Sequence, residues 1–239
     1  MIIRIDENGE RIPLTVADFD SENGTVTVMF QAVGYTTKKM ARLDVGDGVL
    51  DLVGPLGKPT EFLNTKKAIV IGGGVGCAIA YPQAKALYNM GVSVDIISGF
   101  RSKDIVILED EMRKVCDNLY ITTDDGSYGE KGFVTDVLKR LIEKDGYDLV
   151  IAIGPVPMMK FLSKTTLPYN IRTIVSLNPI MIDGTGMCGG CRVTVGGETK
   201  FACVDGPDFD GHKVDFDELM LRNTFYKEEE AHACKVSGI

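Results

Sequence analysis

Histidine is scarce in this chain, with two residues in 239, and no G-x-S-x-G motif is present. Hydrolytic triads need a histidine base beside an activated nucleophile, so this composition gives such chemistry little support. An excess of positive charge is also missing, because 34 acidic residues oppose 26 basic ones and the formal net charge is −8. Without a basic stripe, nucleic-acid binding is not expected.

Long apolar runs are absent as well. No stretch reaches the roughly 20 residues that a membrane-spanning helix needs. The first six residues show no signal-peptide pattern. The default expectation is therefore a soluble, cytoplasmic protein that does not act at a membrane. The length suits two small domains or one large one with a sizeable core.

Three of the six cysteines cluster near the C-terminus, and the other three are scattered. Asp183, Cys188 and Cys191 follow the spacing C-x4-C-x2-C of plant-type 2Fe–2S sites, with an aspartate in the first position. Cys203 follows a dozen residues later. Four ligands must converge on such a cluster, so the pattern indicates a 2Fe–2S site held by the three cysteines and Asp183.

Zinc and a disulfide are the alternatives for these cysteines. A C-x2-C knuckle holds zinc when two more ligands are at hand, and His212 follows Cys203 closely enough to keep this alternative open. A disulfide suits secreted chains better than one without a signal peptide. An aspartate in a glycine-rich turn is also commonly a turn former, so a purely structural Asp183 remains open.

The first 65 residues have the pattern of β structure. Apolar or β-branched runs at 2–5, 12–17, 25–33 and 49–53 are separated by turn signals. A short lysine-rich stretch at 36–43 is expected to form one or two helical turns. Antiparallel strands of this number and length predict a small barrel.

From residue 67 the pattern changes to alternating strands and helices. The expected strands are 68–71, 93–97, 119–122, 149–153 and 172–177. The expected helices are 76–90, 108–115, 132–144 and 157–165. Such alternation predicts a parallel sheet with helices on both faces.

The C-terminal part holds the cysteine loop, a hairpin and a charged tail. The tail 217–231 has a helical period and is expected to pack through Leu219, Leu221 and Phe225. A boundary at 64–66 separates the barrel from the parallel sheet. We expect three units: 1–65, 66–178 and 179–239.

A nucleotide signal opens the parallel sheet. A strand runs into Gly72-Gly73-Gly74-Val75-Gly76, and a helix follows, which is where backbone amides bind a pyrophosphate. The third position of the G-x-G-x-x-G/A pattern is Cys77, and the acidic residue expected after the next strand is absent. Arg101 stands there instead, either to contact an adenosine phosphate or as a solvated side chain. A purely structural glycine turn is the alternative for the whole motif.

Together, the N-terminal strands, the glycine turn and the cysteine loop resemble the ferredoxin–NADP reductase superfamily. Within it the chain is most similar to the small subunits of NADH-dependent reduced ferredoxin:NADP oxidoreductases, the electron-bifurcating transhydrogenases. Electron-transfer subunits of dihydroorotate dehydrogenase and sulfide dehydrogenase subunits are near relatives. The aspartate at the first cluster position is shared with the bifurcating small subunits, whereas the dihydroorotate relative has cysteine there.

The resemblance implies a fold and a set of cofactor contacts. The implied fold is a β-barrel shortened at its N-terminus, an α/β nucleotide-binding domain and a C-terminal 2Fe–2S loop. The implied flavin contacts are Arg11, Pro13, Leu14, Thr15, Gly34, Thr36 and Thr37. The implied pyridine-nucleotide contacts are Gly73, Gly74, Val75, Gly76, Asp124, Gly126, Gly154 and Pro155.

The resemblance also implies FAD, a 2Fe–2S cluster and NAD(H) or NADP(H) as cofactors. The implied partners are a larger FAD/4Fe–4S oxidoreductase subunit and, through the complex, ferredoxin. The family has barrel strands before the segment that begins here at Ile2, so open sheet edges are expected unless a partner chain covers them. The alternative functions are a dihydroorotate or sulfide dehydrogenase electron-transfer subunit and a zinc-knuckle nucleotide-binding module without a redox role.

Overall fold

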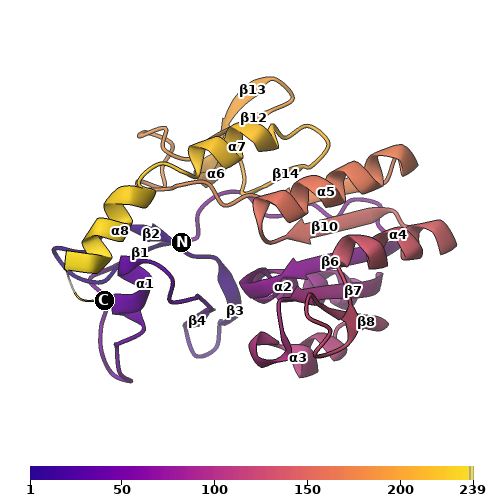
Figure 1. Cartoon of the computed structure of the whole chain (residues 1–239), viewed down its shortest axis with the longest axis horizontal. Helices are drawn as coiled ribbons and strands as arrows, with labels where there is room; N and C mark the ends of the chain where they lie inside the picture. Colours follow the sequence, from indigo (N-terminus) through magenta and orange to yellow (C-terminus); the bar gives the residue numbers. More distant parts are fainter. Residues whose placement is uncertain (237, 239) are drawn as a thin grey trace.

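A seven-stranded sheet forms the centre of the molecule in the computed structural model, which describes residues 1–236 and 238 (Figure 1). The strands lie in the order β14-β11-β10-β6-β7-β8-β9, and all pairs are parallel except β11 with β14. Their bounds are β6 Lys67–Gly73, β7 Ser93–Phe100, β8 Asn118–Thr123, β9 Glu130–Lys131, β10 Leu149–Ile153, β11 Arg172–Ser176 and β14 Asp208–Asp210.

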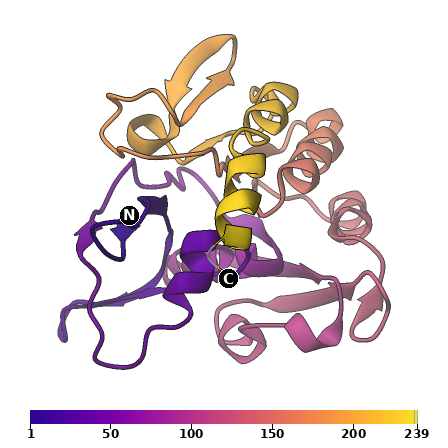
Figure 2. The same ribbon diagram turned by 60° about the vertical axis from the view of Figure 1, so that its left-hand side comes forward.

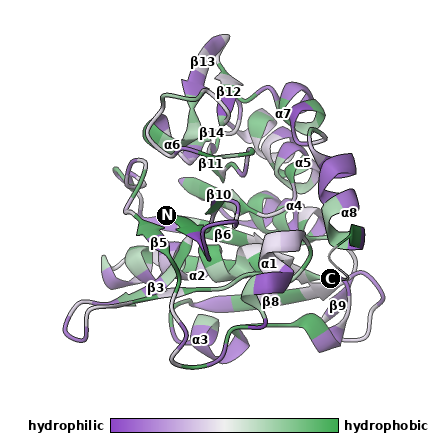
Figure 3. Ribbon diagram, turned by 90° about the vertical axis from the view of Figure 1, so that its left-hand side faces the viewer, coloured by the Kyte–Doolittle hydropathy of each residue, from purple (hydrophilic) through white to green (hydrophobic). Residues whose placement is uncertain are grey.

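Helices cover both faces of this sheet. On β10, Leu149, Ile151 and Ile153 point into the core shared with α2 and α3, while Val150 and Ala152 point into the core shared with α4 and α5. The helices are α2 Cys77–Asn89, α3 Glu109–Arg113, α4 Val134–Lys144 and α5 Val156–Thr166, with short 3-10 turns η1 Gly74–Gly76, η2 Lys103–Ile105 and η3 Leu167–Tyr169. Strand β10, buried on both faces, is apolar throughout, and β6 is mostly apolar, as Figure 3 shows. Strand β7 is also mostly apolar but carries the buried polar residues Asp95 and Ser98. The predicted parallel sheet with helices on both faces is confirmed.

The N-terminal strands form two small sheets instead of one closed barrel. One has the order β2-β1-β5 and the other pairs β3 with β4. The bounds are β1 Ile2–Arg4, β2 Ile12–Pro13, β3 Val16–Asp20, β4 Thr25–Val28 and β5 Asp51–Val53, with α1 Tyr35–Met40 between the last two. An ion pair of 3.1 Å between Lys85 on α2 and Asp18 on β3 joins this part to the nucleotide sheet.

The C-terminal part lies across the sheet and the N-terminal strands (Figure 1). It consists of the irregular cysteine loop, a hairpin and three helices, and it adds β14 to the edge of the sheet. The elements are β12 Arg192–Val195, β13 Glu198–Phe201, α6 Ala202–Asp205, α7 Phe216–Arg222 and α8 Lys227–Val236. None of the helices in residues 1–236 and 238 combines the length and apolar content that crossing a membrane requires.

Three of the sequence predictions for these elements were wrong in detail. The run 12–17 is two strands with different partners, and the run 25–33 is a strand only to Val28. The tail 217–231 is two helices, because the chain turns at Tyr226 with a φ of 66°. Leu219 is buried as expected, whereas Leu221 and Phe225 are exposed. The proposed units 1–65, 66–178 and 179–239 remain a proposal.

Candidate functional site

The glycine turn lies at the carboxyl end of β6, where it packs against the loop after β10. A Cβ on Gly76 would lie 2.6 Å from the Ile153 carbonyl oxygen, so only glycine lets α2 begin this close to the sheet. A Cβ on Gly154 would lie 3.1 Å from the Gly73 Cα, which shows how near the two loops come. Strand β6 is followed in the chain by β7 and β8 on one side of it in the sheet, whereas the later strands β10 and β11 lie on its other side. This reversal of strand order is where open α/β sheets bind ligands.

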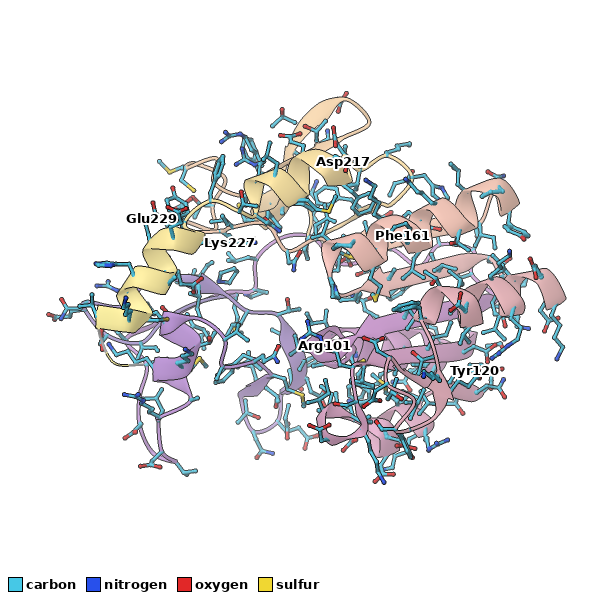
Figure 4. The ribbon with its side chains drawn as sticks, viewed as in Figure 1. Arg101, Tyr120, Phe161, Asp217, Lys227 and Glu229 are labelled. Carbon is cyan, nitrogen blue, oxygen red and sulfur yellow. The ribbon has the colours of Figure 1, made fainter. Side chains whose placement is uncertain are left out.

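Other predicted nucleotide contacts lie at the same edge of the sheet. The Asp124 amide donates to the Phe100 carbonyl at 3.0 Å, and the Asp125 amide donates to the Arg101 carbonyl at 3.2 Å. These bonds hold the loop with Asp124 and Gly126 beside Arg101, whose exposed side chain lies at the edge facing the N-terminal strands (Figure 4). The structure therefore brings Gly73–Gly76, Arg101, Asp124, Gly126, Gly154 and Pro155 to one edge of the sheet.

Cys77 is buried beneath this turn. Burial raises the pKa of its thiol to about 12. A neutral, inaccessible thiol is not a nucleophile, so Cys77 serves here as a small residue that lets α2 pack closely on β6. A Cβ on Gly72 would lie 2.7 Å from the Cys77 Cα, in keeping with that close packing.

The predicted flavin segment, residues 11–15, contains β2. Its residues 12–14 pair with the start of the chain, since β2 pairs with β1 and the Leu14 amide donates to the Met1 carbonyl at 3.0 Å. The Nε of Arg11 is buried and has no hydrogen-bond partner within residues 1–236 and 238. Because a buried donor without an acceptor is costly, this guanidinium suits an anionic group that the polypeptide does not itself provide.

Gly34, Thr36 and Thr37 form the second flavin segment, at the start of α1. The Thr37 hydroxyl oxygen accepts from the amides of Val33 and Gly34, at 3.1 and 2.9 Å. The buried Thr36 hydroxyl donates to Oε2 of Glu10 at 2.7 Å. Glu10 directly precedes Arg11, so this bond connects the two flavin segments.

The cysteine loop brings two of its three thiols together. Cys191 and Cys203 are buried side by side, and the Cys203 amide donates to the Cys191 sulfur at 3.4 Å. Cys188 is exposed, and its sulfur accepts from the Gly190 amide at 3.4 Å. Burial and the neighbouring Cys191 raise the pKa of the Cys203 thiol. Amides directed at sulfurs are a feature by which proteins tune iron–sulfur clusters, so these donors fit such a group.

Asp183 takes part in a turn at the start of this loop. Its Oδ2 accepts from the Thr185 hydroxyl, from the Thr185 amide at 3.0 Å and from the Met187 amide at 3.4 Å. The Thr185 donors, then the Met187 amide and the charge of Arg11, hold the pKa of this carboxyl below its usual value. No group of three or more Cys, His, Asp or Glu side chains within the described residues is arranged to hold a metal. Ligation by Asp183, Cys188, Cys191 and Cys203 therefore remains a proposal, and it requires Asp183 and Cys188 to move their side chains toward Cys191 and Cys203.

The cysteine loop packs on both neighbouring parts of the molecule. A Cβ on Gly184 would lie 2.9 Å from the Leu56 side chain, and the Lys58 amide donates to the Gly206 carbonyl at 2.7 Å. On the other side, the Arg222 guanidinium donates to the Gly190 carbonyl at 3.2 Å. The loop is thereby fixed between the end of the N-terminal part and α7.

Comparison with known proteins gives the family. The iron–sulfur cluster binding domain of dihydroorotate dehydrogenase B matches residues 178–215. The "dihydroorotate dehydrogenase B (NAD(+)), electron transfer subunit homolog" of Thermotoga maritima is 49% identical, over 96% of this chain and 81% of that protein. The corresponding electron transfer subunit of Fusobacterium nucleatum is 36% identical, over 86% of this chain and 81% of that protein. The chain belongs to the family of dihydroorotate dehydrogenase B electron transfer subunits.

A solved structure extends this likeness to the whole chain. A chain of the NADH-dependent reduced ferredoxin-NADP oxidoreductase, a structure described in relation to flavin-based electron bifurcation, matches with a TM-score of 0.93 and 47% identity. The match covers all of this chain and 86% of that one. The predicted superfamily, the reductase-like fold and the iron–sulfur segment at the C-terminus are confirmed. This chain is thus an electron-transfer subunit of an oxidoreductase.

A cavity adjoins Cys188 in this electron transfer subunit. It has a volume of about 260 Å³, and exposed apolar side chains surround it. Its lining includes Ile182, Cys188, Arg222, Phe225 and Tyr226. Sequence reasoning did not identify Arg222 or Glu10, because a surface arginine on a helix and a glutamate in a turn carry no motif. Their roles depend on contacts with distant segments.

Proposed function

We propose that this chain is the small subunit of an electron-bifurcating NADH-dependent ferredoxin:NADP oxidoreductase. The observation that carries the proposal is the full-length likeness to that enzyme's structure, at a TM-score of 0.93. An aspartate at the first cluster position, Asp183, supports this assignment. The cofactors are FAD, a 2Fe–2S cluster and a pyridine nucleotide. They supply two-electron exchange at the nicotinamide and single-electron release through the flavin and the iron centre.

Each cofactor is assigned to one of the segments described above. The amides of Gly73–Gly76 at the start of α2 receive the nucleotide pyrophosphate, and Arg101 lies near the adenosine end. Arg11, whose buried Nε lacks a hydrogen-bond partner within residues 1–236 and 238, is assigned to the flavin phosphate, and the residues around Thr15 to the flavin ring. Cys188, Cys191, Cys203 and Asp183 hold the two irons. No general base is needed, which agrees with the scarcity of histidine.

Electrons leave toward a larger partner subunit at the exposed side of the cysteine loop. Met187, directly before Cys188, is 88% exposed, and Ile182, Val204, Phe225 and Tyr226 are also exposed. Large exposed apolar side chains gathered at one place are typical of protein interfaces. This surface is therefore proposed as the docking face for the partner subunit, with Cys188 at its centre.

An electron-transfer subunit of dihydroorotate dehydrogenase is the second candidate. The family match at residues 178–215 and the names of both curated relatives favour it. The two candidates share their cofactors and differ in the partner and the final electron acceptor. The iron–sulfur match argues against the third alternative, a zinc-knuckle module without a redox role.

Anaerobic purification with iron and flavin analysis tests the shared part of the proposal. We expect two irons and one FAD per chain, with the EPR signal of a reduced 2Fe–2S centre. Cys191→Ser should lose the iron. Preparations that stay free of iron and cannot be reconstituted would refute the proposal. Assays with each purified partner subunit then decide between ferredoxin-coupled NADPH oxidation and dihydroorotate oxidation.

Replacing Asp183 tests its role in the cluster. Asp183→Cys and Asp183→Ala should both shift the reduction potential and the EPR signal if the carboxylate binds iron. Asp20→Ala is the matched control, because Asp20, like Asp183, is an aspartate in a turn whose carboxylate accepts from two backbone amides, here at 2.9 and 3.1 Å. An unchanged potential and signal in both Asp183 variants would leave Asp183 with a turn-forming role alone.

A further inference from the structure

Two arginine side chains hold the two glycines inside the turn 188–191 of the cysteine loop. Nη1 of Arg192 donates to the Gly189 carbonyl oxygen at 3.1 Å. The Arg192 amide donates to the same oxygen at 3.4 Å. Nη2 of Arg222, from a distant segment, donates to the Gly190 carbonyl oxygen at 3.2 Å. Hydrogen bonds from a charged donor are the stronger ones in proteins, so two neighbouring peptide units of this turn are held by their carbonyl groups.

The bond from Arg192 also sets the direction of an amide. The Gly189 carbonyl and the Gly190 N–H belong to one planar trans peptide unit and point to opposite sides of it. The carbonyl is bonded to the Arg192 guanidinium, and the N–H is directed at the Cys188 sulfur, with 3.4 Å between nitrogen and sulfur. Rotation of this peptide would break both bonds together. Arg192 therefore orients a donor toward a proposed ligand of the cluster.

Arg222 is held in its place by the helix that carries it. It is the last residue of α7, which lies beside α5 (Figure 2). Phe216 and Leu219 of α7 are buried in the core shared with α4 and α5. The Arg222 guanidinium lies 6.0 Å from the centre of the Phe225 ring, within the range of a cation–π contact. The core of the nucleotide-binding part thus positions the donor that reaches the cysteine loop.

The same two arginines give the cavity beside Cys188 a positive character. Among the described residues that line it are Arg192 and Arg222 and no carboxylate, although the net charge of the chain is −8. Arg222 is half-buried and Arg192 is exposed. Water and salt screen an exposed charge more than a half-buried one, so the charge of Arg222 has the larger effect on the loop.

We propose that Arg192 and Arg222 are positioning residues that fix the turn 188–191 and raise the reduction potential of the 2Fe–2S centre. Reduction adds one negative charge to such a centre, and nearby positive charges and amides directed at sulfur favour that charge. Both arginines bond to backbone atoms, so their action does not depend on the rotamer of the Cys188 side chain. The inference deepens the proposed function, since it requires a cluster bound by Cys188 and Cys191.

Redox titration of the iron-loaded, full-length chain, followed by EPR, tests the proposal. Arg222→Met removes the charge and the donor together. It should lower the ratio of reduced to oxidised centre at a fixed potential by roughly tenfold, which is a negative shift of about 59 mV for a one-electron couple. Arg192→Met should shift the potential in the same direction by less, because its charge is exposed.

Two conservative variants separate this effect from a loss of structure. Arg222→Lys keeps the charge and should keep most of the potential, whereas Arg222→Gln keeps only a neutral donor and should have a lower potential than Arg222→Lys. Arg172→Met is the matched control, because Nη2 of Arg172 likewise donates to a carbonyl oxygen, that of Glu61, at 2.9 Å. Arg172 lies at the start of β11, whereas the cysteine loop follows the end of that strand, so its variant should keep the parent's potential.

The outcomes distinguish this inference from the proposed function. An iron-loaded Arg222→Met with the parent's potential overturns the inference and leaves the proposed function intact. A shift of equal size in Arg172→Met, or a potential in Arg222→Lys as low as in Arg222→Met, also overturns it. If Arg222→Met does not hold iron, Arg222→Gln takes its place, and the parent's potential in Arg222→Gln overturns the inference. A parent chain that cannot be loaded with iron refutes the proposed function, and the inference falls with it.

Discussion

Replacing Gly76 by alanine tests whether the glycine turn is required for close packing and for nucleotide binding. Gly76 has ordinary right-handed helical angles, with φ of −59° and ψ of −20°, so the backbone itself accepts alanine. By restricting the unfolded chain, alanine at such a position would stabilise the protein by about 0.4–1 kcal/mol. Any loss of stability must therefore come from the contacts of the added methyl group.

Those contacts are with backbone atoms, which cannot rotate away as the end of a flexible side chain can. The new Cβ would lie 2.6 Å from the Ile153 carbonyl oxygen, 0.8 Å closer than the 3.4 Å at which ordinary contact begins. It would also lie 3.0 Å from the Gly154 Cα. Overpacking of this kind costs about 1–3 kcal/mol. After the entropic gain of about 0.4–1 kcal/mol is subtracted, the net loss lies between about 0 and 2.6 kcal/mol. A central value of about 1 kcal/mol is a fall in Tm of roughly 2–4 °C at this chain length.

Nucleotide affinity should fall together with stability. The methyl group pushes the first turn of α2 away from the loop after β10, and the amides of that turn are the proposed donors to the pyrophosphate. Weakening one hydrogen bond to a charged group costs about 1.5 kcal/mol, which is about a tenfold rise in Kd. Circular dichroism melts of the cofactor-free chain and titration with NADH measure the two effects.

Gly146→Ala is the matched control. No atom lies within 4 Å of the position of its Cβ, and the residue is exposed. Its stability should stay within about 0.5 kcal/mol of the parent. If Gly76→Ala melts and binds nucleotide like Gly146→Ala, the close approach of α2 to β10 is not what selects glycine. A lower Tm with unchanged affinity would give Gly76 a packing role alone.

Three further predictions concern single side chains. Arg101→Ala should weaken NADPH binding by roughly tenfold and NADH binding less, because only NADPH carries the additional adenosine phosphate; equal losses would exclude that contact. Burial raises the pKa of the Asp208 carboxyl above its ordinary value of 3.8, so its ionisation destabilises the folded chain as the pH rises through the folded pKa. Asp208→Asn should therefore raise the urea midpoint at pH 8, with a gain that shrinks toward pH 4; a gain independent of pH would contradict this. In the native, cluster-free chain at pH 8, iodoacetamide should modify the exposed Cys188 and spare the buried Cys77. Burial raises the pKa of the Cys77 thiol to about 12, so this thiol stays protonated. Peptide mass spectrometry measures the modification, and equal modification of both cysteines would mean that burial does not protect Cys77.

The sequence predicts the central sheet well because burial leaves a clear pattern there. Strand β10 is fully apolar, and both of its faces are covered by helices, so its composition alone indicates a parallel strand. The sequence also predicts the glycine turn, since a nucleotide-binding turn of this kind follows such a strand and precedes a helix. The short edge strands β9 and β14 were missed because their residues are mostly polar and pair only through tertiary contacts.

The N-terminal and C-terminal parts are harder to predict for two different reasons. Alternation within residues 12–17 predicts a strand but not the strand it pairs with. In the structure these residues belong to β2, which pairs with β1, and to β3, which pairs with β4. At the other end, the helical period continues through Tyr226, where the left-handed conformation ends it. Tyrosine seldom adopts that conformation, so a break at this residue has no sequence signal.

The most informative feature of the site lies between segments and could not be read from spacing. The Thr185 and Met187 donors, and after them the charge of Arg11 in the flavin segment, lower the pKa of the Asp183 carboxyl in the cysteine loop, so Arg11 and Asp183 act on each other electrostatically. Lys58, near the end of the N-terminal part, bonds to Gly206, three residues after Cys203. Only the first of these connections joins the flavin segment to the cluster segment by charge, so a change in charge at Arg11 is felt at Asp183. The direct experimental consequence is that Arg11→Ala should alter the EPR signal or potential of the iron centre, although Arg11 is not among its proposed ligands.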